Sequence, residues 1–342
     1  MKTLLTACVA AACALAQQPK IQNAKLETRT VSGGLESTMN GILSSQTSPV
    51  WVGYAEPIVK GDRNMCCYNN GSYGCFLEGR YGDGVVVSNE ARTVKLEGPT
   101  HLVILFRVED HQIGKTRTST PECDLDAGGL PFIWLEGVQP ADSIHYLTGL
   151  ATKLAKHGGV VSAIALHNDP AADTALDQLA AQNQPESLRR DAVFWMGSAR
   201  GGHGYQALLR ILHDDPSDKV REHAVFAMSE SKEPGAIDAV IKVAHDDKST
   251  HVRGQALFWL AQKAGQKAAA TIENAIQNDP ETEVKKKAVF ALSQIPHGDG
   301  VPLLIQVAQT NRNPEVRKQA MFWLGQSKDP RALAFIEQVL SR

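Results

Sequence analysis

The amino-acid sequence predicts a multidomain protein, in which a small all-β domain precedes an all-α solenoid of 32-residue helical hairpins. Three observations support this prediction. A constant repeat period runs through the second half of the chain, short β-branched runs fill the first half, and an apolar leader stands at the N-terminus. We expect a signal peptide at residues 1–16, a β domain at residues 17–139 and a solenoid at residues 140–342.

The composition is that of an ordinary globular protein. The 342 residues include 35 basic and 37 acidic side chains, which give a net charge of −2, and 43% of them are hydrophobic. A chain so close to neutrality has no field that would hold nucleic acid or an anionic membrane surface along its length. We therefore expect no nucleic-acid partner.

The N-terminus has the pattern of a secretory signal peptide. Lys2 precedes the apolar stretch Leu4–Leu15, and the triplet that ends at Ala16 matches the usual cleavage pattern. Cleavage there predicts a periplasmic or secreted protein. A short buried helix is one alternative, and Leu5–Cys8 resembles a lipoprotein box. No later stretch reaches the roughly 20 apolar residues of a membrane helix, so we expect no transmembrane segment.

Four cysteines follow the leader, and all lie in the predicted β domain: Cys66, Cys67, Cys75 and Cys123. In an oxidising compartment they predict two disulfides, most simply Cys75 with one of the adjacent pair and Cys123 with the other. Four thiolates could instead hold zinc, but adjacent cysteines lack the two-residue spacer that directs both at one metal. We expect disulfides, and no metal or other cofactor.

The β domain is expected to contain short strands at Val50–Tyr54, Gly84–Ser88, Arg92–Glu97, His101–Val108 and Ile113–Ser119. A turn at Glu109–Gln112 would join the last two strands, and Asn69–Ser72 would be a disulfide-pinned loop. A small antiparallel sandwich or a curled sheet fits these strands. The segment Asp124–Gly129 resembles the start of a calcium loop. Because the later oxygen ligands of that loop are missing, we interpret this segment as an Asp/Gly turn.

An alanine recurs at a fixed 32-residue period without insertion, as Ala192, Ala224, Ala256, Ala288 and Ala320. Leu or Val stands four positions before each alanine, Arg or Lys three positions before it, and Phe two positions after it. A second apolar series runs through Leu208, Val240, Ile272, Leu304 and Ile336. So constant a period is the signature of a solenoid.

Each repeat is predicted to be a pair of helices. In one repeat, Tyr205–Leu212 and Val220–Met228 both have helical spacing, and His213–Ser217 separates them. His213 and His245, each beside two aspartates, suit helix ends better than metal ligation. Carried backwards, the period predicts helices near residues 142–156, 158–167 and 172–182, and Ala332–Leu340 would be a C-terminal cap.

The motif Val-Arg-x-x-Ala-x-x-x-Leu after an Asp/Pro turn resembles HEAT repeats, especially the short bacterial HEAT-like repeats of phycobilisome lyases. This resemblance covers residues 142–342. The ankyrin and tetratricopeptide signatures of similar length do not occur. The resemblance implies that the second helix of each repeat lines a concave surface.

A candidate binding face follows on these second helices, with the residues Phe194, Phe226, Phe258, Phe290, Phe322, His223, Gln255, Lys287 and Gln319. Their helical spacing places them opposite the apolar stripe, so exposed rings would anchor an apolar peptide or a partner helix. Alternatively, each ring closes the gap to the next repeat, in which case all five would be fully buried.

The position after each phenylalanine alternates in size, as Trp195, Ala227, Trp259, Ala291 and Trp323. If this position faces the neighbouring repeat, each Trp side chain can occupy the space that the adjacent Ala leaves open. We therefore expect these tryptophans to pack between repeats rather than to form a binding site.

We expect a non-enzymatic, exported adaptor whose solenoid presents a groove to a protein or peptide partner in the cell envelope. The sequence contains none of the common nucleophile, metalloprotease or nucleotide-binding motifs. One alternative is an enzyme or lyase-like accessory subunit with its site in the β domain, where the candidates are Asp124, Asp126, His101 and His111. Another is a regulatory or structural lid protein of the envelope.

Overall fold

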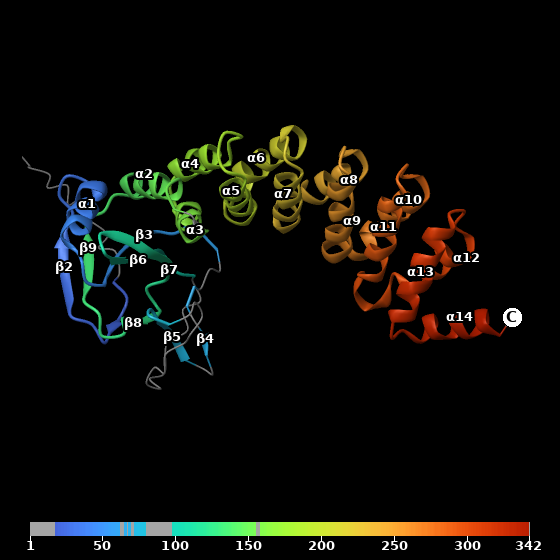
Figure 1. Ribbon diagram of the computed structural model, residues 1–342, viewed down its shortest axis with the longest axis horizontal. Coiled ribbons are helices and arrows are strands. Elements are labelled where there is room, and N and C mark those ends of the chain that lie inside the picture. Colours follow the sequence, from blue (N-terminus) through green and yellow to red (C-terminus); the bar gives the residue numbers. More distant parts are fainter. Residues whose placement is uncertain are drawn as a thin grey trace, which may run out of the picture. The chain divides into compact units, whose positions relative to one another are not determined.

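The structure, a computed structural model, describes residues 18–61, 65–66, 68–69, 72–79, 98–154 and 158–341. The predicted leader, Cys67 and the strands predicted at residues 84–88 and 92–97 lie outside these ranges. The chain divides into two compact bodies (Figure 1). The N-terminal body comprises Met1–Gly149 with Leu166–Asp169, and the C-terminal body comprises Leu150–Ala165 with Pro170–Arg342.

The described elements of the N-terminal body are β1 (Ile21–Gln22), β2 (Leu26–Thr30), α1 (Leu35–Ser45), β3 (Val50–Pro57), β4 (Tyr68–Asn69), β5 (Ser72–Phe76), β6 (His101–Glu109), β7 (Gln112–Ser119), β8 (Asp124–Asp126), β9 (Phe132–Glu136) and α2 (Pro140–Ala151). Three predicted strands therefore correspond to β3, β6 and β7. The predicted turn between β6 and β7 is also present, with positive φ angles of 48° at Asp110 and 62° at His111, as a two-residue hairpin requires.

Both sheets mix parallel and antiparallel pairs. One sheet has the order β2-β9-β3-β6-β7 and the other β1-β8-β5-β4. The pairs β3–β6, β6–β7 and β4–β5 are antiparallel, whereas β9 is parallel to β2 and β3, and β8 is parallel to β1 and β5. The antiparallel arrangement predicted for this domain is therefore only partly correct. The late strands β8 and β9 insert between early strands, and local turn signals do not reveal such long-range insertions.

A hydrophobic core joins the two sheets of the N-terminal body. Trp51, Leu105 and Phe132 of the larger sheet pack in one cluster with Cys75 and Leu125 of the smaller sheet. Strand β3 is buried at seven of its eight residues, so both of its faces are covered. Helix α1 was not predicted, although its buried positions have helical spacing.

A disulfide joins Cys66 to Cys123, with 5.3 Å between their Cα atoms. This pairing agrees with the prediction that Cys123 bonds to one of the two adjacent cysteines. Cys75 is also disulfide-bonded. The Sγ atoms of these three residues lie within 4.8 Å of one another, but sulfurs held in disulfides are not zinc ligands.

The helices that follow α2 are α3 (Gly158–Leu166), α4 (Ala171–Ala180), α5 (Glu186–Ala199), α6 (Gly201–Asp214), α7 (Asp218–Glu230), α8 (Ala236–Asp246), α9 (Thr250–Ala264), α10 (Ala269–Asn278), α11 (Thr282–Ser293), α12 (Val301–Thr310), α13 (Pro314–Gln326) and α14 (Pro330–Leu340), with short 3₁₀ turns η1 (Gly265–Ala268) and η2 (Pro296–Gly298). The four helices predicted outside the clear repeats correspond to α2, α3, α4 and α14. Helix α2 differs in one respect, because most of it belongs to the N-terminal body rather than to the solenoid.

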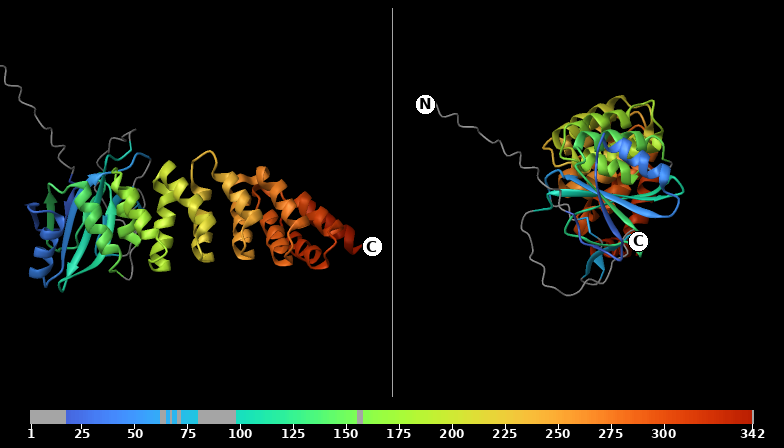
Figure 2. Two further views of the ribbon diagram at one scale, coloured as in Figure 1. Left: turned by 90° about the horizontal axis from the view of Figure 1, so that it is seen from above. Right: turned by 90° about the vertical axis from the view of Figure 1, so that its left-hand side faces the viewer.

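The C-terminal body has two layers of helices. Figure 1 shows α4, α6, α8, α10 and α12 in one layer and α5, α7, α9, α11 and α13 in the other. Helices of the second layer pack on one another in chain order, and the left view of Figure 2 shows the repeats side by side. Among the described residues, no helix is both long enough and apolar enough to span a membrane.

Small residues allow each first-layer helix to approach the preceding second-layer helix closely. A Cβ atom on Gly204 would lie 2.0 Å from the carbonyl oxygen of Met196, and one on Gly300 would lie 1.9 Å from that of Leu292. In the other repeats the same position is alanine, as Ala172, Ala236, Ala268 and Ala332. The recurring small residue therefore sets the distance between the two layers of helices, just as the recurring apolar residues form the core.

Candidate binding face of the solenoid

The second-layer helices carry a continuous row of aromatic rings, which we call the aromatic ladder: Phe194, Trp195, Phe226, Phe258, Trp259, Phe290, Phe322 and Trp323. Residues Val220, Ala224 and Val225 of α7 are fully buried on the opposite side of their helix, as the helical periodicity requires. The apolar stripe therefore orients the phenylalanine positions of each helix away from the core.

Rings of neighbouring repeats are in contact along the whole ladder. Phe194 and Phe226 stack with centroids 5.8 Å apart, and Phe226 lies 4.5 Å from Trp259. The pattern repeats in the next two repeats. Phe258 and Phe290 stack with centroids 5.9 Å apart, and the ring of Phe290 lies 4.8 Å from the indole of Trp323. Aromatic pairs at these separations are attractive, so the ladder reinforces the joints between repeats.

These contacts explain the alternation of Trp and Ala. Where a repeat has Ala after its Phe, that Phe stacks directly on the Phe of the preceding repeat. Where a repeat has Trp, the indole contacts the preceding Phe instead and also touches its own Phe, edge to face. The alternation therefore keeps one ring-to-ring contact at every joint, which agrees with the packing role expected of the tryptophans.

The five phenylalanines are packed but not fully buried. Phe194, Phe226, Phe258 and Phe290 are half-buried, and Phe322 at the end of the ladder is 54% exposed. Full burial, which would have excluded an anchoring role, is not observed. The rings therefore both pack between repeats and present an accessible edge.

A polar row runs beside the rings across three repeats. The Nε2 atom of His251 on α9 lies 3.0 Å from the carboxylate oxygen Oε1 of Glu222 on α7. The Nζ atom of Lys287 on α11 lies 2.9 Å from Nδ1 of the same imidazole ring. Because an ammonium group can only donate, Nδ1 is the acceptor and Nε2 carries the hydrogen. The lysine stem occupies space left by Gly254, where a Cβ atom would lie 2.2 Å from the lysine Cδ.

Burial shifts the titration of two side chains on this face. It lowers the pKa of the Lys287 ammonium below its usual value. It also lowers the pKa of His223, and the nearby positive charge of Arg190 adds to the effect. Gln255 and Gln319 are half-buried at the equivalent positions of α9 and α13. All nine predicted face residues thus lie on second-layer helices, whereas the contacts of His251 with Glu222 and Lys287 were not predicted.

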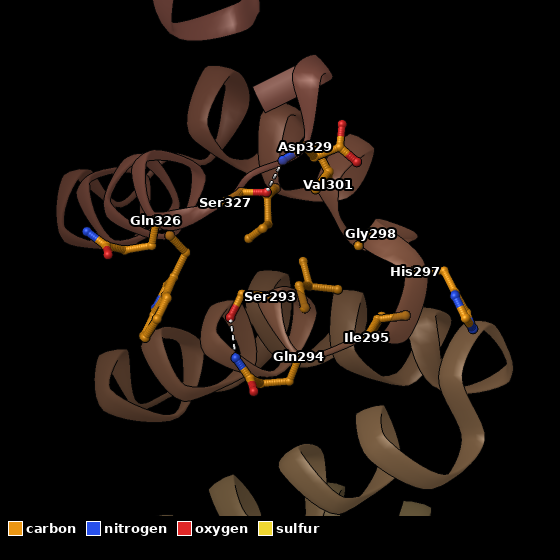
Figure 3. Close-up of a pocket in the computed structure, with 13 residues that line it drawn as sticks. Ser293, Gln294, Ile295, His297, Gly298, Val301, Gln326, Ser327 and Asp329 are labelled. Carbon is orange, nitrogen blue, oxygen red and sulfur yellow. Dashed lines mark hydrogen bonds between the residues drawn. The ribbon is translucent and has the colours of Figure 1, made fainter. Parts of the chain in front are cut away.

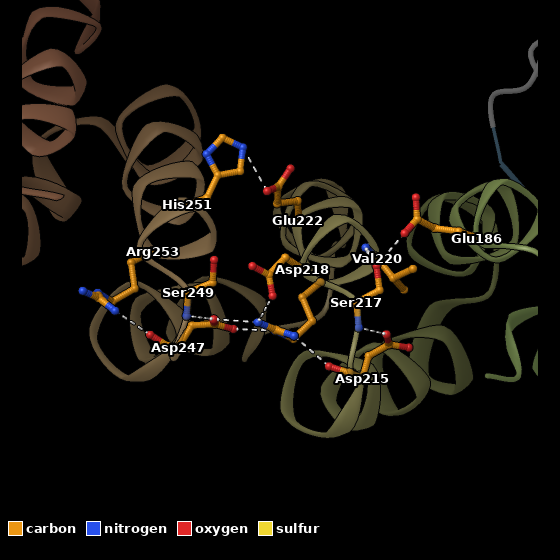
Figure 4. A network of polar contacts seen from close by, with 11 residues as sticks. Glu186, Asp215, Ser217, Asp218, Val220, Glu222, Asp247, Ser249, His251 and Arg253 are labelled. Carbon is orange, nitrogen blue, oxygen red and sulfur yellow. Dashed lines mark hydrogen bonds and ion pairs between the residues drawn. The ribbon is translucent and has the colours of Figure 1, made fainter. Parts of the chain in front are cut away.

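Buried ion pairs join successive repeats at the N-terminal ends of the second-layer helices (Figure 4). Arg221 donates two hydrogen bonds to Asp247, at 2.8 and 3.0 Å, and Arg253 does the same to Asp279, at 2.9 and 3.0 Å. Arg189 is paired with Asp215 in the preceding joint. The sequence contains the signal for these pairs, because each arginine precedes its aspartate by a constant separation of 26 residues. The turn pattern alone does not reveal this second role of the aspartates.

The joint between α11 and α13 lacks this ion pair. The residues in the equivalent positions are Lys285 and Asn311. Lys285 instead donates to the carbonyl oxygen of Gln277, and the Asn311 carbonyl accepts from Arg317. This joint therefore depends more on apolar and aromatic packing than the others do.

The four residues considered for an enzyme are not gathered in one site. Asp124 and Asp126 accept hydrogen bonds from the side chains of Gln22 and Asn23. Both aspartates lie in strand β8, so the turn predicted at residues 124–129 is confined to the residues after Asp126. His101 begins β6, whereas His111 follows its far end and contacts the carbonyl oxygen of Leu43. A nine-residue strand separates the two histidines by about 30 Å, too far for one catalytic site.

The sequence matches the family model of HEAT repeats over residues 205–280 and again over residues 269–342. No curated protein matches the chain. Similar solved structures include the complex of CpcE and CpcF of phycocyanin lyase from Nostoc sp. PCC7120, with 20% identity over 55% of this chain and 77% of that chain and a TM-score of 0.32.

Two further solved structures are similar at lower identity. A structure of Kap95p with RanGDP has 17% identity over 54% of this chain and 29% of that chain, with a TM-score of 0.36. Human deoxyhypusine hydroxylase in complex with glycerol has 14% identity over 58% of this chain and 90% of that chain, with a TM-score of 0.28. At these identities the likeness concerns the fold alone.

Proposed function

We propose, from the premise that residues 205–342 are HEAT repeats, that this protein is an exported scaffold which binds a protein or peptide of the cell envelope. The aromatic ladder is the observation that supports the proposal. Its rings are held in place by their neighbours, so little side-chain entropy is lost when a partner covers their exposed edges. Large rings of this kind are the residues that most often dominate binding energy at interfaces.

The proposed role is binding rather than catalysis. The four residues considered for an enzyme in the N-terminal body lie on different elements, and the two aspartates among them are engaged in structural hydrogen bonds. By contrast, the ladder extends along the second-layer helices from α5 to α13, and the polar row lies beside it from α7 to α11. An extended surface of this kind suits an elongated partner better than a small substrate.

Export is the second part of the proposal. It is supported by the N-terminal leader pattern and by the Cys66–Cys123 disulfide, because such bonds persist in oxidising compartments. Fractionation of cells that express the full chain tests it directly. Recovery of the intact chain from the cytosol, with its leader uncleaved, would contradict export.

Phe322 offers the cleanest test of binding, because it is the most exposed ring of the ladder. A photoreactive phenylalanine at position 322 should cross-link the partner in envelope extracts, and the purified partner can then be measured against variants. Phe322→Ser should weaken binding by about tenfold or more, the effect of losing one buried aromatic anchor.

Leu333 provides a matched control. It is an exposed apolar residue, at 59%, on α14 outside the second layer. A photoreactive residue there should give no cross-link, and Leu333→Ser should leave the dissociation constant unchanged. Equal effects of the two substitutions, or none from Phe322→Ser, would exclude the ladder as the binding face.

A further inference from the structure

The solenoid contains a pocket of about 420 Å³ between the turns that follow α11 and α13 (Figure 3). Polar side chains on both sides of it are already paired, since Gln294 donates to the Ser293 hydroxyl and the Asp329 N–H donates to that of Ser327. The indole Nε1 atom of Trp323 on its wall is inaccessible. These contacts indicate no particular ligand, whereas an edge of the larger sheet in the N-terminal body does indicate a partner.

The larger sheet ends at an open edge. Strand β2 (Leu26–Thr30) is its outermost strand and, within the part of the chain that the structure describes, pairs only with β9 (Figure 1). Four of its five residues are exposed, and Arg29 is half-buried. The strand contains no proline, and its pairing with β9 has no register shift. It therefore lacks two of the features that commonly keep edge strands from pairing with another chain.

Alternate residues of β2 direct their backbone groups to this edge. The carbonyl oxygen of Lys25 accepts from the N–H of Phe132 at 2.9 Å. The N–H of Val31 donates to the carbonyl oxygen of Glu136 at 2.8 Å, so the odd-numbered residues face β9. Successive residues of a strand direct their N–H and C=O groups to opposite sides. The residues that present these groups to the open edge are therefore Leu26, Thr28 and Thr30.

The two residues between them carry opposite charges. Glu27 and Arg29 lie on one face of β2, and the guanidinium group donates to the carboxylate at 2.6 and 3.1 Å. The side chain of Glu27 is nevertheless 58% exposed and that of Arg29 41% exposed. Each of them can therefore meet a second opposite charge without losing the first.

An antiparallel copy of β2 matches this edge. When Thr28 pairs with itself across a two-fold axis, Leu26 stands opposite Thr30 of the second copy, and Glu27 stands opposite its Arg29. The even-numbered pairs are those whose N–H and C=O groups face the edge, so each can exchange two hydrogen bonds. Each Arg29 then lies between the Glu27 of its own strand and the Glu27 of the second copy. The strand is thus complementary to itself, as a two-fold interface requires.

The charges select this register over its neighbours. Pairing centred on Glu27 would place that carboxylate opposite its copy, and pairing centred on Arg29 would place two guanidinium groups opposite each other. Parallel pairing in register would also oppose like charges. Like charges directly opposite one another destabilise a sheet, whereas opposite charges stabilise it. Antiparallel pairing centred on Thr28 avoids all of these repulsions.

We propose that two copies of this protein associate through β2, as antiparallel strands centred on Thr28, so that their larger sheets form one continuous sheet. The contact would also cover Leu26, which is 45% exposed although it is a large apolar residue. The inference is independent of the partner proposed for the aromatic ladder, because β2 lies in the N-terminal body and the ladder in the C-terminal body.

Sedimentation equilibrium of the purified chain tests the proposal by charge exchange. The wild type should show a monomer–dimer equilibrium. Glu27→Arg and Arg29→Glu each place like charges opposite one another twice, so either variant alone should dimerise about tenfold more weakly or worse. An equimolar mixture of the two variants opposes unlike charges at both pairs and should recover dimers of wild-type strength. Recovery on mixing cannot come from variants that have merely failed to fold.

Two further variants locate the contact. Thr28→Pro removes the outward N–H at the centre of the pairing and should abolish dimerisation while the circular dichroism spectrum is unchanged. Lys115→Glu reverses an exposed charge on β7, at the other edge of the same sheet, and should leave the dissociation constant unchanged. The proposal would be overturned by a wild type that stays monomeric, by dimers that survive the single charge reversals, by a mixture that recovers no dimers, or by an equal effect of Lys115→Glu.

Discussion

Glu56 in β3 is a buried carboxyl whose replacement by Gln should change the pH dependence of stability. It is 1% exposed, and its Oε1 atom has no hydrogen-bond partner. Burial raises the pKa of this carboxyl from 4.5 to about 8, with smaller contributions from the charges of Asp169 and Asp142. In the folded protein the group is therefore protonated at neutral pH, whereas in the unfolded chain it is ionised.

The magnitude follows from the two pKa values. Between them the folded state binds more protons than the unfolded state, so the free energy of unfolding falls as the pH rises from 4.5 to about 8. At about 1.36 kcal/mol per pKa unit, the loss between pH 5 and pH 8 is about 3 kcal/mol. Glu56→Gln removes this titration. The variant should match the wild type at about pH 5 and exceed its stability by about 3 kcal/mol at pH 8.

Hydrogen exchange measured by mass spectrometry isolates the N-terminal body from the solenoid. Peptides that cover β3 and β6 give the opening free energy of the sheet at each pH. Glu136→Gln, which changes an exposed carboxyl at the end of β9, is the matched control and should show no pH-dependent difference. If Glu56→Gln differs from the wild type by the same amount at pH 5 and pH 8, burial does not control this carboxyl.

Three further predictions concern the joints and the disulfide. Arg221→Met leaves the buried Asp247 carboxylate without its ion-pair partner and should lower the free energy of unfolding in urea by about 3–5 kcal/mol. Lys285→Met, at the joint without an ion pair, should lower it by less than about 1 kcal/mol. Equal losses for the two variants would contradict the role of the ion pairs. Gly300→Ala should lower the melting temperature, because its Cβ would meet a carbonyl oxygen at 1.9 Å. Gly325→Ala, which enters open space, should add up to about 1 kcal/mol, and the opposite order would refute this packing. The Cys66–Cys123 disulfide joins residues 57 positions apart, so its removal should lower the stability of the N-terminal body by about 4 kcal/mol. Hydrogen exchange of the β8 amides measures this loss. Unchanged exchange would show that the bond is dispensable for stability.

The helical repeats were predictable because their information is local and repeated. Each second-layer helix carries its own apolar stripe, and five copies of the same spacing leave little ambiguity about where a helix begins. The mixed sheets were not predictable in this way. Strand β9 pairs in parallel with β2 and β3, although both lie far earlier in the chain. No short turn marks such a pairing, and burial on both faces removes the alternation that would orient β3.

The sequence predicted which residues lie on the candidate face, but not which of them contact one another. Helical spacing shows that Phe226 and His223 share one side of α7. It does not show which residue of the next helix stands opposite, so neither the contact of Phe226 with Trp259 nor that of His251 with Glu222 was foreseen. The inter-repeat ion pairs could have been found, because the separation of Arg221 from Asp247 recurs in two other joints.

The Trp and Ala alternation changes what counts as one building block of this protein. By backbone and core the block is a single helical hairpin, but by ring contacts it is two successive hairpins, since only every second one carries an indole. Removing one repeat would bring two indole-bearing repeats together, Trp195 next to Trp259, with no alanine between them to make room. Removing or adding two repeats would keep the same pattern of ring contacts at every joint. We therefore expect length changes in this solenoid to be tolerated better in pairs of repeats than singly, whether they arise by gene duplication or by engineering.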